Sequence, residues 1–157
     1  MLLREETAPE TIQVIECNID DSTGEMLGNA MEQLLKAGAR DVHFLPCFMK
    51  KNRPAWLLRV IADAAKVPCF EEILFRCTTT IGLRKYPVER TVMEREPVEV
   101  KLPFGTVRAK RCSFGGIVRS YPEYESVKLA AEAAGLPFLE VWRAAEKALG
   151  GTAPSGA

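Results

Sequence analysis

The spacing of hydrophobic positions predicts a strand followed by a helix at the start of the chain. Residues 11–18 form a nearly continuous apolar, β-branched run, which indicates a buried strand. Ser22 is expected to cap the following helix, with Glu25 three residues later completing a capping box, and Gly38 is expected to end it. The apolar face of this helix is predicted from residues at i, i+4, i+7 and i+8: Leu27, Met31, Leu34 and Leu35.

The same reasoning predicts three more strands and a second helix. Strands are expected at 41–49 and 56–62, joined by a turn at 50–54, and a fourth strand is expected at 79–86. Pro68 is expected to open the second helix, because proline fits the first turn of a helix. The buried face of that helix is predicted to consist of Phe70, Ile73, Leu74 and Cys77.

The resulting order β-α-β-β-α-β is that of the ferredoxin-like split βαβ unit. In such a sandwich two helices cover one face of the sheet, and the other face needs a cover of its own, often another subunit. The sequence therefore predicts an α+β fold whose main domain spans residues 11–90.

The pattern changes after residue 90. Alternating apolar residues around a Pro-Phe-Gly turn predict a β-hairpin over 98–109, and 113–116 is expected to be a flexible joint. A helix is predicted from Pro122 to Ala134, with a last helix beginning at Pro137. Residues 91–149 are thus expected to form a β-hairpin and a C-terminal helical hairpin, both appended to the ferredoxin-like domain. Residues 1–10 are expected to be a flexible N-terminus, and residues 150–157 a disordered tail.

Composition narrows the class of protein. With 21 basic and 21 acidic residues the formal net charge is zero, so a double-stranded nucleic acid is not an expected partner. No apolar run approaches the roughly 20 residues that span a bilayer, and the N-terminus has no signal-peptide pattern. Five cysteines without C-x-x-C spacing indicate reduced thiols in a cytoplasmic protein, and the lack of a long apolar run means that no membrane contact is expected.

Four short polar clusters interrupt the hydrophobic pattern, and their chemistry points to one kind of ligand. The clusters are 18–21, 50–54, 78–84 and 122–125. Carboxylate oxygens suit a hard divalent cation, whereas lysine, arginine and hydroxyl groups suit the phosphates that such a cation accompanies. An aromatic ring such as that of Tyr124 can stack on a nucleobase.

Each cluster also has a purely structural interpretation. Asp20 and Asp21 can stabilise the start of the first helix, and Lys50–Arg53 can be a solvated hairpin tip. The threonines 78–80 favour a strand, and Glu123 suits the first turn of a helix.

Taken in order, Ile19-Asp20-Asp21, Met49-Lys50-Lys51-Asn52-Arg53-Pro54, the run from Thr78 to Arg84 and Pro122-Glu123-Tyr124-Glu125 resemble the C-terminal portion of the LarC family. The resemblance runs from about Thr11 to Leu149. It implies a CTP-dependent cyclometallase of the lyase class. Such an enzyme inserts nickel into pyridinium-3,5-bisthiocarboxylic acid mononucleotide, forming the nickel-pincer nucleotide cofactor of lactate racemase-type enzymes. It also implies a ferredoxin-like domain that binds CTP with Mg²⁺ or Mn²⁺ and assembles as a homotrimer or hexamer.

The resemblance carries site residues over by position. Asp20 and Asp21 are implied as metal ligands. The implied nucleotide-binding residues are Asn18, Asp20, Lys50, Lys51, Asn52, Arg53, Thr78, Thr79, Thr80, Arg84, Pro122, Glu123 and Tyr124. No residue among them is a convincing general base.

The chain also departs from the family pattern. Tyr121 stands where the family commonly has lysine, and the long N-terminal part with its histidine-rich stretch is missing. The chain alone is therefore expected to bind nucleotide without completing metallation, with the missing N-terminal part as a partner. The alternative function is a non-catalytic ferredoxin-like oligomerisation module.

Overall fold

The structure, a computed structural model, describes residues 10–150. The chain divides between Thr91 and Val92 into two compact units, each of which is described by itself. The predicted flexible N-terminus and disordered tail lie outside the described residues, except that Glu10 opens the first strand and Gly150 follows the last helix.

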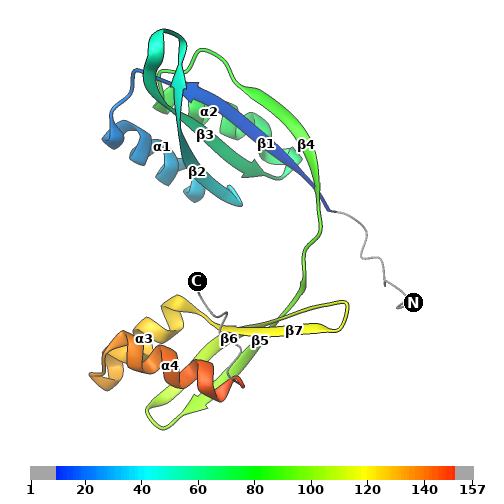
Figure 1. The fold of residues 1–157 in the computed structure, drawn as a ribbon, viewed down its shortest axis with the longest axis vertical. Coiled ribbons are helices and arrows are strands. Elements are labelled where there is room, and N and C mark those ends of the chain that lie inside the picture. The colour runs from blue at the N-terminus through cyan, green and yellow to red at the C-terminus, as the bar shows by residue number, and fades with distance from the viewer. Residues whose placement is uncertain (1–9, 151–157) are drawn as a thin grey trace. The chain divides into compact units, whose positions relative to one another are not determined.

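The first unit is a four-stranded antiparallel sheet with two helices on one face (Figure 1). Its strands are β1 (Glu10–Ile19), β2 (Asp41–Met49), β3 (Arg53–Ala62) and β4 (Arg84–Arg90), in the order β2-β3-β1-β4. Its helices are α1 (Gly24–Lys36) and α2 (Val67–Cys77), and short 3-10 turns lie at Lys50–Asn52 and Ala64–Lys66. Each pair of strands joined by a helix is separated by one other strand, as in a split βαβ unit. The predicted α+β class is confirmed.

The core of this unit lies between the sheet and the two helices. Alternate residues of β1 (Ile15, Cys17 and Ile19) face the helices, and Phe70 and Leu74 of α2 pack against them with no exposed surface. Burying a large apolar side chain contributes about 1.5–3 kcal/mol, so this face holds the unit together. The remaining buried members of the cluster are Leu27, Leu34, Val42, Leu58, Val60, Ala62 and Val67.

The opposite face of the sheet carries a buried carboxylate. Glu16 of β1 is 7% exposed, and it accepts hydrogen bonds from Arg59 Nε at 2.6 Å and from the Tyr86 hydroxyl at 3.0 Å. Burial raises the pKa of Glu16, but the hydrogen bonds from Arg59 and Tyr86 and the nearby guanidinium groups outweigh burial and lower that pKa overall. Glu16 is therefore held ionised, and it joins β1, β3 and β4 across the open face.

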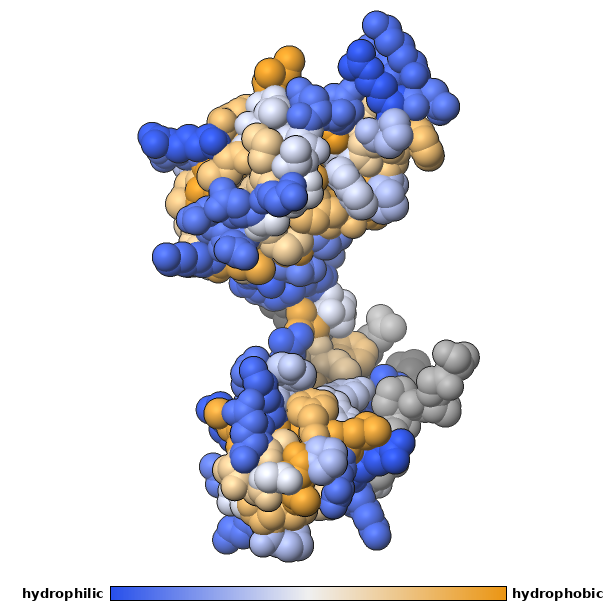
Figure 2. Space-filling model, turned by 90° about the vertical axis from the view of Figure 1, so that its left-hand side faces the viewer, coloured by the Kyte–Doolittle hydropathy of each residue, from blue (hydrophilic) through white to orange (hydrophobic). Residues whose placement is uncertain are grey.

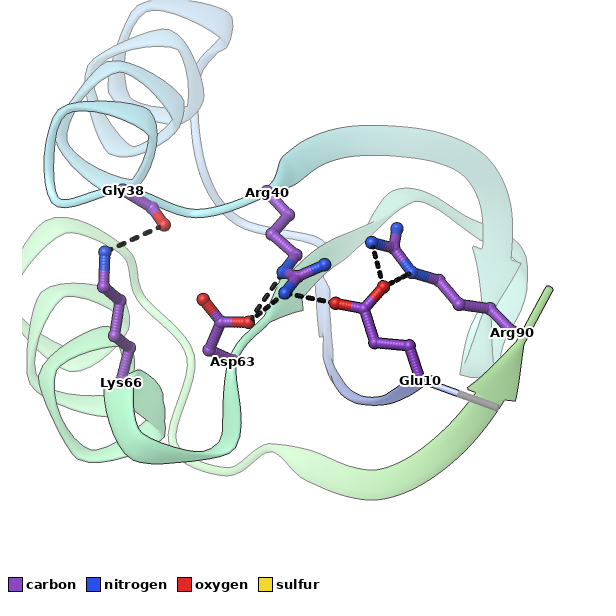
Figure 3. A network of polar contacts seen from close by, with 6 residues as sticks. All are labelled: Glu10, Gly38, Arg40, Asp63, Lys66 and Arg90. Carbon is purple, nitrogen blue, oxygen red and sulfur yellow. Dashed lines mark hydrogen bonds and ion pairs between the residues drawn. The ribbon is translucent and has the colours of Figure 1, made fainter. Parts of the chain in front are cut away.

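Ion pairs close the end of the sheet at which β1 begins (Figure 3). Arg40 contacts Glu10, and its Nε lies 2.6 Å from Asp63 Oδ1. Arg90, at the end of β4, donates to Glu10 Oε2 at 2.7 Å. Hydrogen bonds from Arg40 and Arg90 lower the pKa of Glu10. The acidic cluster at Asp20 lies beyond the other end of β1.

The second unit is a three-stranded sheet with a helical hairpin on one face (Figure 1). Its elements are β5 (Glu94–Leu102), β6 (Gly105–Phe114), β7 (Ile117–Pro122), α3 (Tyr124–Ala134) and α4 (Phe138–Ala148). The small core consists of Val107, Val127, Ala131, Val141 and Ala145. The predicted helical hairpin is present, and Gly135 ends α3 in the left-handed conformation that favours glycine.

The predicted β-hairpin is present as β5 and β6, but the structure adds a third strand, β7, that the sequence analysis did not predict. Residues 113–116 are not a flexible joint: Ser113 and Phe114 end β6, and Gly115 and Gly116, both with positive φ, form the turn into the third strand. Pro122 is the last residue of β7, opposite Ala109, so α3 begins two residues later, at Tyr124. Strand β7 is short and interrupted by polar residues, and pairing with β6 stabilises it more than its own pattern does.

Two boundaries in the first unit also differ from the prediction. Strand β4 begins at Arg84 and not at Thr79, because Thr78 and Thr80 hydrogen-bond locally and hold the chain in a turn. Thr23, not Ser22, caps α1: its hydroxyl accepts from the Met26 amide. Ser22 bonds to Thr79 instead, so its side chain is committed elsewhere.

The surface of each unit mixes hydrophobic and hydrophilic side chains, and long hydrophilic side chains project at the rims of the face drawn in Figure 2. All five cysteines are free thiols. Within residues 10–150, no helix combines the length and the apolar character that a membrane crossing requires.

Candidate functional site

Three of the four polar clusters meet at one end of the first sheet. Strand pairing brings them there: Ile19 lies opposite Trp56, Met49 opposite Arg53, and Glu16 opposite Arg84. The loop after β1, the β2–β3 turn and the loop before β4 therefore converge, although Ser22 in the first and Thr79 in the last lie 57 positions apart in the chain.

The basic turn is joined to the acidic loop by an ion pair. Arg53 Nη1 lies 3.3 Å from Asp20 Oδ2, with the Arg53 side chain 58% exposed and the Asp20 side chain 24% exposed. Asp20, Lys50, Lys51 and Arg53, together with Met49, line a hollow of about 340 Å³. Three cations and one carboxylate thus face the same space, an arrangement that suits an anion accompanied by a cation.

The backbone of this turn is unusual. Lys51 and Asn52 have φ values of 61° and 56°, in the left-handed region that side chains other than glycine rarely adopt. Asparagine tolerates this region, but for lysine the conformation costs about 1–2 kcal/mol. Strained backbone of this kind clusters at binding sites, where its role is to fix the direction of side chains.

Of the three threonines 78–80, only Thr79 directs its hydroxyl toward the other polar clusters. Thr79 donates to Asp21, and its hydroxyl lies 2.9 Å from that of Ser22. Thr78 instead donates to the Leu74 carbonyl at 2.7 Å, and Thr80 to the carbonyl of the glycine two residues later. Thr78 therefore serves the end of α2. The structural alternative, a strand favoured by these threonines, is not met, because β4 begins only at Arg84.

Asn18 and Arg84 form a polar contact on the open face of the sheet. Arg84 Nη2 donates to Asn18 Oδ1 at 2.7 Å, and Asn18 Nδ2 lies 3.6 Å from Cys47 Sγ. Arg84 is half exposed, and it also lies 3.8 Å from Glu16. The contact orients the guanidinium group beside the end of β1.

The fourth cluster lies in the second unit. Glu123 occupies the N-cap position of α3 without a side-chain capping bond, and its carboxylate lies 3.7 Å from Arg108 and 3.5 Å from Lys110, both on β6. Tyr124 is 57% exposed, with its ring centroid 5.3 Å from that of Phe138. Arg108 and Lys110 were missed in the sequence, although their spacing two residues apart on a strand was a signal that both point the same way.

The oxygen donors of the first unit suit a magnesium-like ion. Asp21 supplies a carboxylate in contact with the Thr79 hydroxyl, which lies 2.9 Å from that of Ser22, and Asp20 supplies a second carboxylate, paired with Arg53. Proteins commonly hold Mg²⁺ with one or two carboxylates while substrate phosphates and water complete the shell. In the part of the chain from residue 10 to residue 150, no group of three or more His, Cys, Asp and Glu side chains is arranged to hold a metal ion.

Comparison with known proteins gives a family match. The family model described as "Nickel insertion protein" matches residues 1–142. The chain is 48% identical over 134 residues to the pyridinium-3,5-bisthiocarboxylic acid mononucleotide nickel insertion protein of Alkaliphilus metalliredigens, a match that covers 85% of the chain and 32% of that protein. The protein of the same name from Geobacillus kaustophilus is 44% identical over 141 residues, covering 88% of the chain and 34% of that protein. The chain spans about a third of the length of these relatives.

Two solved structures are similar. One is described as LarC2, the C-terminal domain of a cyclometallase involved in the synthesis of the NPN cofactor of lactate racemase, in its apo form. It matches with a TM-score of 0.85 and 39% identity, over 90% of this chain and 98% of that one. The other, protein MK0293 from Methanopyrus kandleri, has a TM-score of 0.60 and 23% identity over 92% of this chain and 91% of that one, a likeness of fold alone.

Proposed function

The chain belongs to the nickel insertion protein family, as its four ordered motifs predicted, and we propose that it is the CTP-binding C-terminal part of a nickel insertion protein. The whole protein would be a CTP-dependent cyclometallase of the lyase class. Nickel and pyridinium-3,5-bisthiocarboxylic acid mononucleotide would be its substrates. The part of the relatives that this chain does not span would be the partner that completes nickel insertion.

The convergence of Asp20, Arg53 and Thr79 at one end of the sheet carries this proposal. Lys50, Lys51 and Arg53 would neutralise the triphosphate, with arginine supplying a planar fork and the lysines point charges. Their exposed positions suit a ligand that arrives from solvent. A charge-assisted hydrogen bond to phosphate contributes about 1.5–3 kcal/mol, so three such groups contribute about 4.5–9 kcal/mol, which corresponds to millimolar to micromolar binding.

A divalent ion would be held by Asp20 and Asp21. Bound Mg²⁺ or Mn²⁺ supplies Lewis-acid stabilisation of charge on phosphate oxygens. Thr79 donates to Asp21 and so orients that carboxylate, while Arg53 restrains Asp20 until the ligand arrives. Asn52, at the tip of the turn, would add an amide to the phosphate contacts.

The other residues implied by the resemblance have different roles in the proposal. Arg84, oriented by Asn18, would contribute charge at the border of the site. Thr78 and Thr80 would shape the loop that presents Thr79. Only the resemblance supports a nucleotide-binding role for Pro122, Glu123 and Tyr124. The variant Tyr124→Ala tests that role separately.

Isothermal titration calorimetry with CTP and Mn²⁺ tests the proposal. Binding is expected with CTP and to be weaker with ATP, GTP and UTP. Asp20→Asn should abolish the metal dependence of binding. Asp41→Asn is the matched control, because Asp41 is an exposed aspartate at the other end of the sheet.

Two outcomes would count against this function. No heat change with CTP, or equal affinity for all four nucleoside triphosphates, would contradict it. An intact oligomer without any nucleotide response would instead support the non-catalytic oligomerisation module. Light scattering of the same sample tests the expected homotrimer or hexamer.

A further inference from the structure

A second hollow, of about 320 Å³, lies at the same end of the first sheet and has different walls. It shares Asp20 with the cationic hollow, but its other walls are largely apolar. Those that matter most are Ile19, Pro46, Phe48, Pro54 and Trp56. Ligand pockets of this size are typically apolar with a few polar groups at the border, which is the composition found here.

Strand register sets the two aromatic side chains on the same face. Phe48 lies opposite Pro54, and Pro46 lies opposite Trp56, so Phe48 and Trp56 occupy diagonal positions on neighbouring strands. Diagonal neighbours in an antiparallel pair are about 7–8 Å apart. Both side chains line the same hollow, so a planar ring that enters it can contact either aromatic face.

These two aromatic residues are exposed although they adjoin the core. Phe48 is 72% exposed and Trp56 is 42% exposed. Phe44 supports the indole of Trp56 in an edge-to-face contact, with ring centroids 6.3 Å apart and planes at 73°. Rings of this size beside a charged turn are typical of a surface that a ligand covers.

The two hollows together have complementary halves. One presents Lys50, Lys51 and Arg53, and the other presents Phe48 and Trp56, with Asp20 in the wall of both. A molecule that carries both phosphates and a planar ring matches this pair, whereas inorganic phosphate uses one half and an apolar ligand the other.

We propose that the hollow beside Phe48 and Trp56 binds the heteroaromatic ring of a nucleotide whose phosphates lie against Lys50–Arg53. The inference rests on the phosphate site proposed above and assigns the ring a place within it. The ring has two possible sources, the cytosine of CTP and the pyridinium ring of a mononucleotide substrate. Both are planar heterocycles that stack on aromatic side chains.

Tryptophan fluorescence tests the ring site directly. Titration with CTP and Mg²⁺ is expected to quench Trp56, and the quenching should disappear in Trp56→Phe. Nicotinic acid mononucleotide is the second arm, as a pyridinium mononucleotide. Quenching by either compound supports the proposal and identifies the source of the ring. Tripolyphosphate with Mg²⁺ is expected to bind in calorimetry without quenching.

A pair of matched variants separates stacking from phosphate binding. Phe48→Ala should lower the affinity for the nucleotide that quenches Trp56 on the order of 10- to 100-fold, because the stacking of one base is that strong. It should leave the affinity for tripolyphosphate unchanged. Phe75→Ala is the control, since Phe75 is an exposed phenylalanine on α2 that lines neither hollow, and it should change neither affinity.

The outcomes distinguish this inference from the proposed function. Tripolyphosphate binding without quenching by either nucleotide would overturn the ring site alone, and absence of tripolyphosphate binding would overturn the phosphate site as well. Equal losses for both ligands in Phe48→Ala would also refute the ring site. A change of oligomer mass in Phe48→Ala without loss of nucleotide would identify the aromatic pair as a subunit contact and refute it too.

Discussion

Replacing Arg53 by alanine separates ligand binding from folding, because the two roles predict effects of very different size. Arg53 and Asp20 form an ion pair at 3.3 Å between side chains that are 58% and 24% exposed. Pairs of this kind contribute about 0.2–1 kcal/mol to stability. A charge-assisted hydrogen bond to phosphate contributes about 1.5–3 kcal/mol. Arg53→Ala should therefore weaken CTP by roughly 10- to 150-fold while costing less than about 1 kcal/mol of folding free energy.

Two measurements on one preparation check this. Urea denaturation gives the change in unfolding free energy, and calorimetry with CTP and Mn²⁺ gives the change in affinity. Arg111→Ala is the matched control, because Arg111 lies 3.2 Å from Glu96 in the second unit and its side chain is exposed to a similar extent as that of Arg53. It should lose the same small stability and retain CTP affinity. The loss in Arg53→Ala should also shrink as salt is added, since exposed charges are screened.

The refuting result is the reverse ratio. If Arg53→Ala lost more than about 2 kcal/mol of stability and bound CTP normally, Arg53 would be a structural residue, and the small stability expected of an exposed ion pair would be wrong for it. An equal loss of affinity in Arg111→Ala would show that the effect follows total charge and not the position of one side chain.

Three further predictions concern the first unit. Glu16→Gln should cost about 1–3 kcal/mol in urea denaturation, because Arg59 and Tyr86 lose a charged acceptor. The lowered pKa of Glu16 adds stability above the ordinary pKa of 4.5, and this stability is lost as pH falls through the pKa of the folded state. The difference in stability from wild type should therefore shrink at acid pH, and a constant difference would contradict this. Phe70→Ala, at a fully buried position, should cost about 3–5 kcal/mol, and a loss below about 1 kcal/mol would place Phe70 outside the core. Lys51→Gly should leave thermal stability unchanged or raise it by up to about 1 kcal/mol while weakening CTP, since glycine relieves the positive φ and removes a cation; a fall in stability would refute the strain argument.

Local pattern was enough to predict the helices and most strands of the first unit. The apolar spacing of α1 and α2 indicates which residues face the sheet, because a helix repeats every 3.6 residues whatever lies against it. The boundaries that failed are those where side chains compete for the backbone. Thr78 and Thr80 bond locally and delay β4, and neither contact follows from strand propensity.

Within the site, some residues could be identified from the sequence and others only from the fold. Lys50–Arg53 were identifiable from charge density alone, and the structure presents them at one turn. Thr79 differs from its neighbours only because its hydroxyl meets Asp21, and this pairing of residues 58 positions apart depends on the fold. Phe48 and Trp56 carried no sequence signal for a ring site, because apolar residues in strands are usually interior.

The sequence by itself determined the family, the order of elements in the first unit and the chemistry available in each cluster. All three depend on residue identity and short-range spacing. Tertiary structure decided which clusters meet, that β7 exists, and that two aromatic side chains stand diagonally beside the cationic turn. The physical reason is strand register: periodicity selects the buried face of a strand, whereas only the pairing of whole strands, set by the packed core, selects its neighbours.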